Sequence, residues 1–226
     1  MSLDGASAIV VGAGRVGSPA ALYLAAAGVG RIGIVDRAEV DVGVADELLH
    51  FAPDAGVPKA ANAAVKLGAL NPDVAVDTYP VAFEAGNAEA IVTGADVVLD
   101  SVRSEDSPWL VNDACCAAGA PFVKALLSHS GGELVAVVPG RSACARCAFG
   151  DGLPEAPDAA LPAAAAGVLG ALQALAGLRL LAPGGEESDA TLLSLDARTG
   201  EVSARRGERR ADCPACADSA PASQSS

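Results

Sequence analysis

Histidine, aromatic and basic side chains are scarce in this sequence of 226 residues. It has two histidines, 3% aromatic residues, and 15 Lys and Arg against 28 Asp and Glu, for a net charge of −13. A chain with so few cations cannot neutralise many phosphates, so we expect no binding to DNA or RNA. Because aromatic residues are few, Leu, Val and Ala must supply the packing at any subunit interface.

Two further features bear on the compartment of the protein. The first residues lack the basic segment and apolar core of a signal peptide, and we expect a cytoplasmic protein. The uncharged stretch Ala159 to Leu178 has the length of a membrane span. It is built from Ala and Gly and contains Pro162 and Gln173, so we expect no membrane insertion and instead a buried core helix from about Ala165 to Leu181.

Apolar runs bounded by turn residues alternate with helical stretches in the first half of the chain. This alternation is typical of parallel strands joined by crossover helices. We predict strands near Ala8–Val11, Arg31–Val35, Val74–Thr78, Asp96–Asp100 and Pro121–Ala125. The predicted helices lie near Val16–Ala27, Pro58–Leu67, Ala88–Thr93 and Pro108–Ala118.

The pattern changes after Ala125, where shorter strands are joined through turns and the Ala-rich helix. We predict antiparallel strands at Glu133–Val138, Thr191–Leu195 and Glu201–Arg205. The predicted fold is therefore α/β, with a Rossmann-like, doubly wound, mainly parallel sheet extended by antiparallel strands. We expect one domain over residues 1–216 and a disordered tail over residues 217–226, which has no apolar side chain larger than Ala or Pro.

A glycine-rich turn follows the first predicted strand. Gly12-Ala-Gly14-Arg-Val-Gly17 opens a helix, and Asp36 ends the second strand about twenty residues later. Such glycines let backbone N–H groups approach phosphate at a helix N-terminus, and the acid can hydrogen-bond a ribose. The motif fits NAD, FAD or ATP. It also occurs as an empty turn that serves strand–helix packing, but we favour nucleotide binding.

Four of the six cysteines form two CxxC pairs. Cys144 and Cys147 make the first pair, and Cys213 and Cys216 the second. Four thiolates at this spacing fit a closed tetrahedral zinc site, which would be structural and would pin the C-terminal segment to the antiparallel part. Two unrelated reduced pairs are disfavoured because both spacings fit a metal site. A redox CxxC is less favoured still, because neither pair follows the first strand of a thioredoxin-like unit.

These pieces occur together and in a familiar order. The run from Gly12 to Asp36 resembles the N-terminal nucleotide fingerprint of the ThiF/MoeB/HesA family, the ATP-dependent activators of ubiquitin-like sulfur-carrier proteins. Further segments resemble the same family: Val57-Pro-Lys-Ala, Leu70-Asn-Pro-Asp, Val111-Asn-Asp-Ala-Cys115, Ala166-Gly-Val-Leu-Gly170 and Asp212-Cys-Pro-Ala-Cys216. The resemblance covers about Ala6 to Cys216.

The resemblance implies a dimeric enzyme that binds MgATP and adenylates the C-terminal Gly-Gly carboxylate of a small ubiquitin-like protein for sulfur transfer. The second subunit would be an identical chain or a related protein. In-line attack on the α-phosphate needs cations on the phosphates, a carboxylate for magnesium, and orientation. The matching positions are Gly12, Gly14 and Gly17 for the phosphate cradle, Asp36 for the ribose and Lys59 for phosphate.

Several positions depart from the family pattern. The family has Ser-Asn-Leu-x-Arg-Gln before an Ile-Leu-His; counted back from His50, Gly43 replaces its Asn and Asp46 its Arg. Arg103 stands where the family carries its magnesium-handling Asp. Ala163 occupies the place of a cysteine that is reactive in many members, so covalent sulfur handling in that loop is not available.

Three readings follow from these departures. In the first, adenylation survives on a rearranged site, where Arg103 joins Lys59 at the phosphates and Asp46, Glu105 or Asp106 holds magnesium. In the second, the protein is a catalytically degenerate relative that binds a nucleotide or a partner protein as an accessory subunit. The third, an NAD(P)-dependent oxidoreductase, is disfavoured because the two histidines, His50 and His129, offer no convincing general acid.

Overall fold

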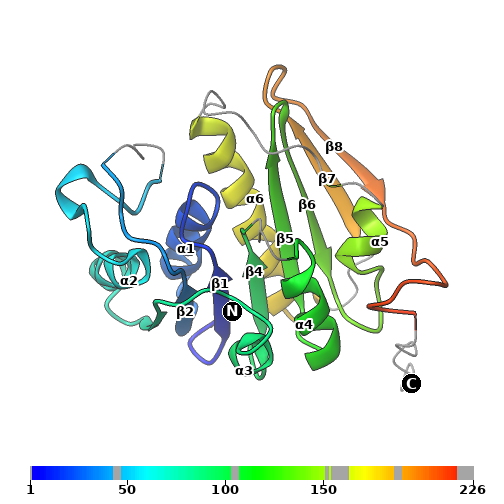
Figure 1. The fold of residues 1–226 in the computed structure, drawn as a ribbon, viewed down its shortest axis with the longest axis horizontal. Helices are drawn as coiled ribbons and strands as arrows, with labels where there is room; N and C mark the ends of the chain where they lie inside the picture. Colours follow the sequence, from blue (N-terminus) through cyan, green and yellow to red (C-terminus); the bar gives the residue numbers. More distant parts are fainter. Residues whose placement is uncertain are drawn as a thin grey trace.

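An eight-stranded mixed sheet runs through the molecule in the order β3-β2-β1-β4-β5-β6-β7-β8 (Figure 1). The computed structural model describes residues 2–42, 47–102, 107–150, 153, 163–185 and 190–217. Its strands are β1 (Ser7–Val11), β2 (Arg31–Val35), β3 (Ala75–Tyr79), β4 (Val97–Asp100), β5 (Phe122–Ser128), β6 (Gly131–Val137), β7 (Thr191–Asp196) and β8 (Val202–Arg206). The predicted α/β sheet is confirmed.

The helices cover both faces of the sheet. They are α1 (Gly17–Ala26), α2 (Lys59–Leu70), α3 (Ala88–Val92), α4 (Leu110–Ala118), α5 (Ala145–Phe149) and α6 (Ala163–Leu181), with a 3₁₀ turn at Ala52–Asp54. Helices α1, α2 and α6 pack on one face, and α3, α4 and α5 on the other. Because both faces are covered at the centre of the sheet, β4 is buried at every position, whereas the edge strand β3 has no buried position.

The parallel half is doubly wound about β1. From β1 the chain moves outward through β2 and β3, then returns to the other side of β1 for β4 and β5. This reversal puts the topological switch point at the carboxyl ends of β1 and β4, the position that doubly wound folds use as their ligand-binding crevice. The predicted parallel strands agree with the observed ones to within a residue or two, except that β5 continues to Ser128 because its pairing with β6 extends that far.

The antiparallel half begins at β5, which pairs in parallel with β4 and antiparallel with β6. Strands β7 and β8 extend it in the same antiparallel sense, as predicted. Helix α5, five residues long, and the 3₁₀ turn were not predicted. The predicted tail lies, apart from Ala217, outside the described residues.

Helix α6 is the Ala-rich stretch that the sequence marked as a core helix. By its length and its mean hydropathy of 1.6 alone, this helix could cross a membrane. Within the structure it packs against α1, β4, β5 and β6. The buried Gln173 donates from Nε2 to the carbonyls of Asp100 and Val123, both at 2.9 Å, and accepts from Ser101 Oγ at 2.7 Å. A polar side chain is therefore accommodated in an apolar helix because it ties α6 to the ends of β4 and β5.

Two glycines of α6 give a matched test of this packing. A Cβ on Gly170 would lie 2.4 Å from the carbonyl oxygen of Val16, whereas a Cβ on Gly167 would meet nothing within 4 Å. We expect Gly170→Ala to destabilise the fold by about 1–3 kcal/mol, because α6 must move away from α1. Gly167→Ala should instead stabilise it by up to about 1 kcal/mol through helix propensity. Urea unfolding of both variants checks this, and equal effects would contradict the close helix contact.

Candidate functional site

The glycine-rich turn joins β1 to α1 at the crevice. Gly12 has φ +92°, a conformation that favours glycine, and its N–H donates to the carbonyl of Val35 at 2.8 Å. A Cβ on Gly17 would lie 1.7 Å from the carbonyl oxygen of Gly12. Both positions therefore require glycine, and the turn places the N-terminus of α1, the positive end of its dipole, at the carboxyl end of β1.

Asp36 ends β2 beside this turn, as the sequence predicted. Its Oδ2 accepts a hydrogen bond from the N–H of Ala13 at 2.8 Å, and its Oδ1 accepts one from the N–H of Ala38, also at 2.8 Å. The carboxylate thus holds the turn in place. Each oxygen retains a second lone pair, so the same group remains able to accept from a ribose hydroxyl.

Lys59 is the first residue of α2, and its ammonium is paired with Glu47. Its Nζ lies 2.8 Å from Glu47 Oε1 and 2.7 Å from Glu47 Oε2, and the two side chains are 11% and 8% exposed. The Glu47 carboxylate also lies against the turn, since a Cβ on Gly14 would be 3.2 Å from Oε1. The sequence reading missed Glu47, although it is the neighbour of Asp46 in the stretch that departs from the family.

His50 links α2 to the glycine turn. Its Nε2 lies 2.8 Å from the carbonyl oxygen of Ala13, and its Nδ1 lies 2.9 Å from Asn62 Nδ2. Since the amide nitrogen of Asn62 donates, Nδ1 accepts and Nε2 carries the proton. Burial lowers the pKa of His50, which keeps the ring neutral. This histidine is a structural support of the turn, in line with the sequence reading.

A second buried ion pair lies at the carboxyl end of β4. Lys124 Nζ is 2.7 Å from Asp100 Oδ2, and the two side chains are 1% and 0% exposed. Burial raises the pKa of Asp100, and the Lys124 ammonium opposes that rise. No sequence motif marked Lys124. Two ammonium groups, those of Lys59 and Lys124, thus lie near the crevice and each is neutralised by a carboxylate.

Several predicted site residues lie outside the described part of the chain. These are Gly43, Asp46, Arg103, Glu105 and Asp106. The role of Arg103 at the phosphates and the candidate magnesium carboxylates therefore remain predictions. Ala163, which replaces the reactive cysteine of many relatives, is the first residue of α6.

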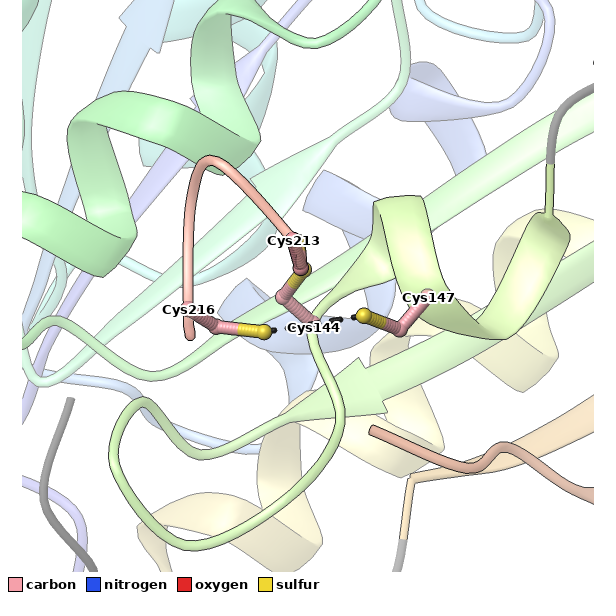
Figure 2. Close-up of side chains that lie close together, drawn as sticks. All are labelled: Cys144, Cys147, Cys213 and Cys216. Carbon is pink, nitrogen blue, oxygen red and sulfur yellow. Dashed lines mark hydrogen bonds between the residues drawn. The ribbon is translucent and has the colours of Figure 1, made fainter. Parts of the chain in front are cut away.

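The four cysteines of the CxxC pairs come together on the face of the sheet that carries α4 and α5 (Figure 2). Their sulfur atoms all lie within 4.8 Å of one another. The Sγ atoms of Cys144 and Cys213 are 3.6 Å apart, as are those of Cys147 and Cys216. Tetrahedral zinc thiolates with bonds near 2.3 Å place their sulfurs about 3.8 Å apart, so this donor set fits zinc with no open position.

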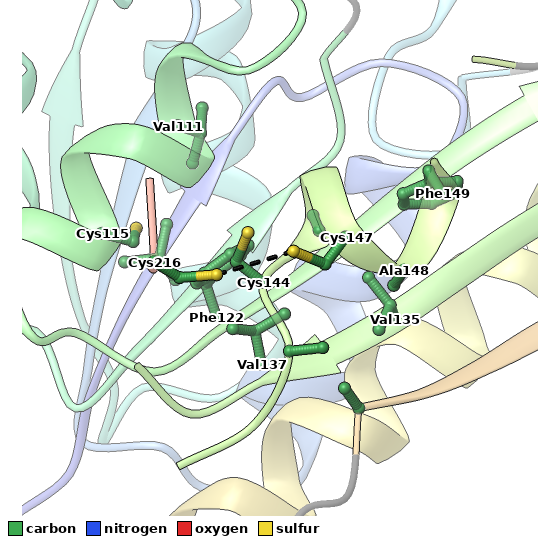
Figure 3. Close-up of a cluster of buried hydrophobic side chains, with 14 of the residues drawn as sticks. Val111, Cys115, Phe122, Val135, Val137, Cys144, Cys147, Ala148, Phe149 and Cys216 are labelled. Atoms are coloured by element: carbon green, nitrogen blue, oxygen red, sulfur yellow. Dashed lines mark hydrogen bonds between the residues drawn. The ribbon is translucent and has the colours of Figure 1, made fainter. Parts of the chain in front are cut away.

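Neighbouring groups hold the cluster in place. Arg146, between the first two cysteines, donates from Nε to Asp113 Oδ1 of α4 at 2.8 Å. The N–H of Ala145 donates to Asn112 Oδ1 at 2.8 Å, and the N–H of Arg210 donates to Cys147 Sγ at 3.4 Å. The N–H to sulfur bond is of the kind that stabilises a metal-bound thiolate. The cluster is also continuous with the apolar core around Phe122, Val135, Val137 and Phe149 (Figure 3).

Without a metal the thiols of the cluster differ in acidity. Burial raises the pKa of Cys147 to about 12 and also raises that of Cys216. Burial acts in the same direction on Cys213, but the N–H of Ala215 and the neighbouring thiols outweigh it and lower that pKa to about 7. Metal binding would therefore have to displace protons from buried thiols, as is usual for structural zinc sites.

Zinc content tests this cluster directly. We expect freshly purified, untagged protein to carry one zinc per chain, because four thiolates satisfy its coordination. Cys213→Ser and Cys216→Ser should lose the metal and several kcal/mol of stability. The matched control is Cys115→Ala, a buried thiol of α4 outside the cluster, which should retain the zinc. Elemental analysis well below one zinc per chain in the wild type would contradict the assignment.

The chain is similar to several known proteins. Residues 2–215 match the ThiF family. Among curated proteins, the SAMP-activating enzyme E1 of Haloferax volcanii is 36% identical over 93% of this chain and 80% of its own length. The sulfur carrier protein adenylyltransferase of Thermus thermophilus is 36% identical over 96% of this chain and 84% of its length. The adenylyltransferase and sulfurtransferase MOCS3 of Sus scrofa is 38% identical, and the chain spans 50% of it.

The solved structures agree on the fold. A crystal structure of MccB from E. coli with ATP superposes with a TM-score of 0.81 at 19% identity, over 95% of this chain and 67% of that one. At that identity the likeness concerns the fold alone.

Proposed function

The chain belongs to the ThiF family, and from that premise we propose that it is an ATP-dependent adenylyltransferase acting on the C-terminus of a small ubiquitin-like sulfur-carrier protein. The names of the relatives support this proposal, since they include a SAMP-activating enzyme and a sulfur carrier protein adenylyltransferase. The observation that supports it is that Asp36 and Glu47 both lie against the glycine turn at the carboxyl end of β1, and that Glu47 connects Lys59 to it.

Each of these groups has a place in adenylation. The reaction joins a carboxylate oxygen to the α-phosphorus of ATP and releases pyrophosphate, so the phosphates must be held in line and their charge compensated. N–H groups at the start of α1 would bind phosphate oxygens, Asp36 would accept a ribose hydroxyl, and the Lys59 ammonium would offset charge on the leaving pyrophosphate. Magnesium would accompany ATP, with Asp46, Glu105 and Asp106 as candidate carboxylate ligands.

A second function has its own support. The Lys59 ammonium is paired with Glu47, and Ala163 cannot form a covalent sulfur intermediate. These two observations favour an accessory subunit that binds a nucleotide or a partner protein without adenylating it. We rank it second, because the glycine turn, Asp36, Lys59 and the four-cysteine cluster all persist.

Pyrophosphate exchange separates the two functions. With MgATP and a ubiquitin-like protein of the same organism that ends in Gly-Gly, we expect labelled pyrophosphate to enter ATP. Lys59→Met should lower the exchange rate roughly 100-fold, because a cation at the leaving group is lost. Lys66→Met is the matched control, since Lys66 lies on the same helix but pairs with Asp54 away from the glycine turn. Absence of exchange in folded, ATP-bound protein would favour the accessory function.

We further propose that the protein works as a dimer. Helices α1 and α6 pack against each other, and they leave Tyr23, Val168 and Leu175 exposed to solvent. The occupant that we propose for this surface is a second copy of the chain, because the resemblance implies a dimer that uses apolar surface of the parallel half. Leu and Val rather than clustered aromatic residues would supply the packing, consistent with the 3% aromatic content.

Sedimentation at micromolar concentration tests the dimer. We expect the wild type to sediment as a dimer and Leu175→Glu to weaken the association at least tenfold, because a carboxylate would be buried in apolar contact. Val65→Glu, which places the same charge at an exposed valine of α2, should leave the dimer intact. A wild-type monomer, or equal loss in both variants, would contradict this interface.

A further inference from the structure

Glu47 occupies an unusual position for a carboxylate. Its side chain is buried, and its Oε1 lies 3.2 Å from where a Cβ on Gly14 would be, so it rests on the middle glycine of the turn. On its other side is the Lys59 ammonium, 2.8 and 2.7 Å from its two oxygens. A carboxylate is therefore held between the glycine turn and a lysine.

That environment is the one that a nucleotide phosphate requires. N–H groups at a helix N-terminus and a lysine ammonium are the usual ligands of a bound phosphate. We propose that Glu47 is an internal competitor for the phosphate subsite, which holds Lys59 until a nucleotide displaces it. This inference rests on the proposed function, because it concerns the same nucleotide site. Glu47 acts here as a regulating residue that takes no part in the chemical step.

The pair behaves differently from an ion pair in solvent. The Arg31–Asp77 pair shows the contrast, because its two side chains are 63% and 40% exposed. Because Glu47 and Lys59 are shielded from water, their attraction is screened less, and a phosphate must compete with the carboxylate for the Lys59 ammonium. The carboxylate would also repel a phosphate bound beside it. Both effects lower the affinity for a nucleotide.

The experiment is a calorimetric titration with ATP, once in excess EDTA and once with magnesium. Glu47→Gln keeps the size of the side chain and removes its charge, so we expect roughly tenfold tighter binding in both conditions. Asp77→Asn is the control, since it removes one charge from the exposed Arg31–Asp77 pair, and it should bind ATP as the wild type does. If the glutamine variant folds poorly, Glu47→Ala takes its place, and it should likewise bind ATP more tightly than the wild type.

Three results would overturn the proposal. Weaker binding of MgATP by Glu47→Gln with unchanged binding in EDTA would make Glu47 a magnesium ligand. Equal affinity of wild type, Glu47→Gln and Glu47→Ala would show that the carboxylate does not compete. Failure of all the proteins to bind ATP would remove the subsite itself. If the Glu47 variants bind ATP more tightly but no pyrophosphate exchange occurs, the competitor stands and the proposed adenylation falls.

Discussion

The close approach of Gly17 to the carbonyl of Gly12 is the constraint on which the site depends. A side chain at position 17 would collide with that oxygen. Because glycine has none, the backbone can turn tightly enough for α1 to start soon after β1. The turn presents Ala13 to two supports at once, because Asp36 accepts from its N–H and His50 donates to its carbonyl. The residue after β2 and the segment before α2 are thereby fixed to the backbone of the same residue.

A second set of contacts joins the two halves of the sheet. Gln173 of α6 bonds to the carbonyls of Asp100 and Val123, so the ends of β4 and β5 are held together beside the crevice. The antiparallel half is secured elsewhere, at the four-cysteine cluster, where Arg146 and Asn112 connect α5 to α4. A metal in that cluster would stabilise the segment that follows β8, which otherwise contributes few buried apolar side chains.

The sequence predicted the parallel half well because its signals are local. Apolar runs bounded by glycines marked β1 and β2, and Gly12, Gly14, Gly17 and Asp36 marked the turn between strand and helix. The CxxC spacing likewise brought Cys144, Cys147, Cys213 and Cys216 together correctly. Each of these patterns lies in a few neighbouring residues, because a tight turn needs glycine at fixed positions and a metal site needs cysteines at a fixed spacing.

Features that depend on tertiary contact escaped the sequence. Lys59 was expected to be available for phosphate, but Glu47 approaches it from twelve positions earlier in the chain, a pairing that no local pattern encodes. The Asp100–Lys124 pair forms across two strands for the same reason. Helix α5 is too short for hydrophobic periodicity to reveal. Arg103 and Asp46 lie outside the described residues, so their proposed exchange of roles is still a prediction.

The central claim is that the crevice at β1 is a nucleotide site. Amide hydrogen exchange with and without saturating MgATP tests it most directly, because bound phosphate protects the N–H groups that it contacts. The account predicts slower exchange over Gly12–Ser18 and at the start of α2, with little change in β7 and β8. Protection confined to other segments, or no protection at saturating ATP, would contradict it.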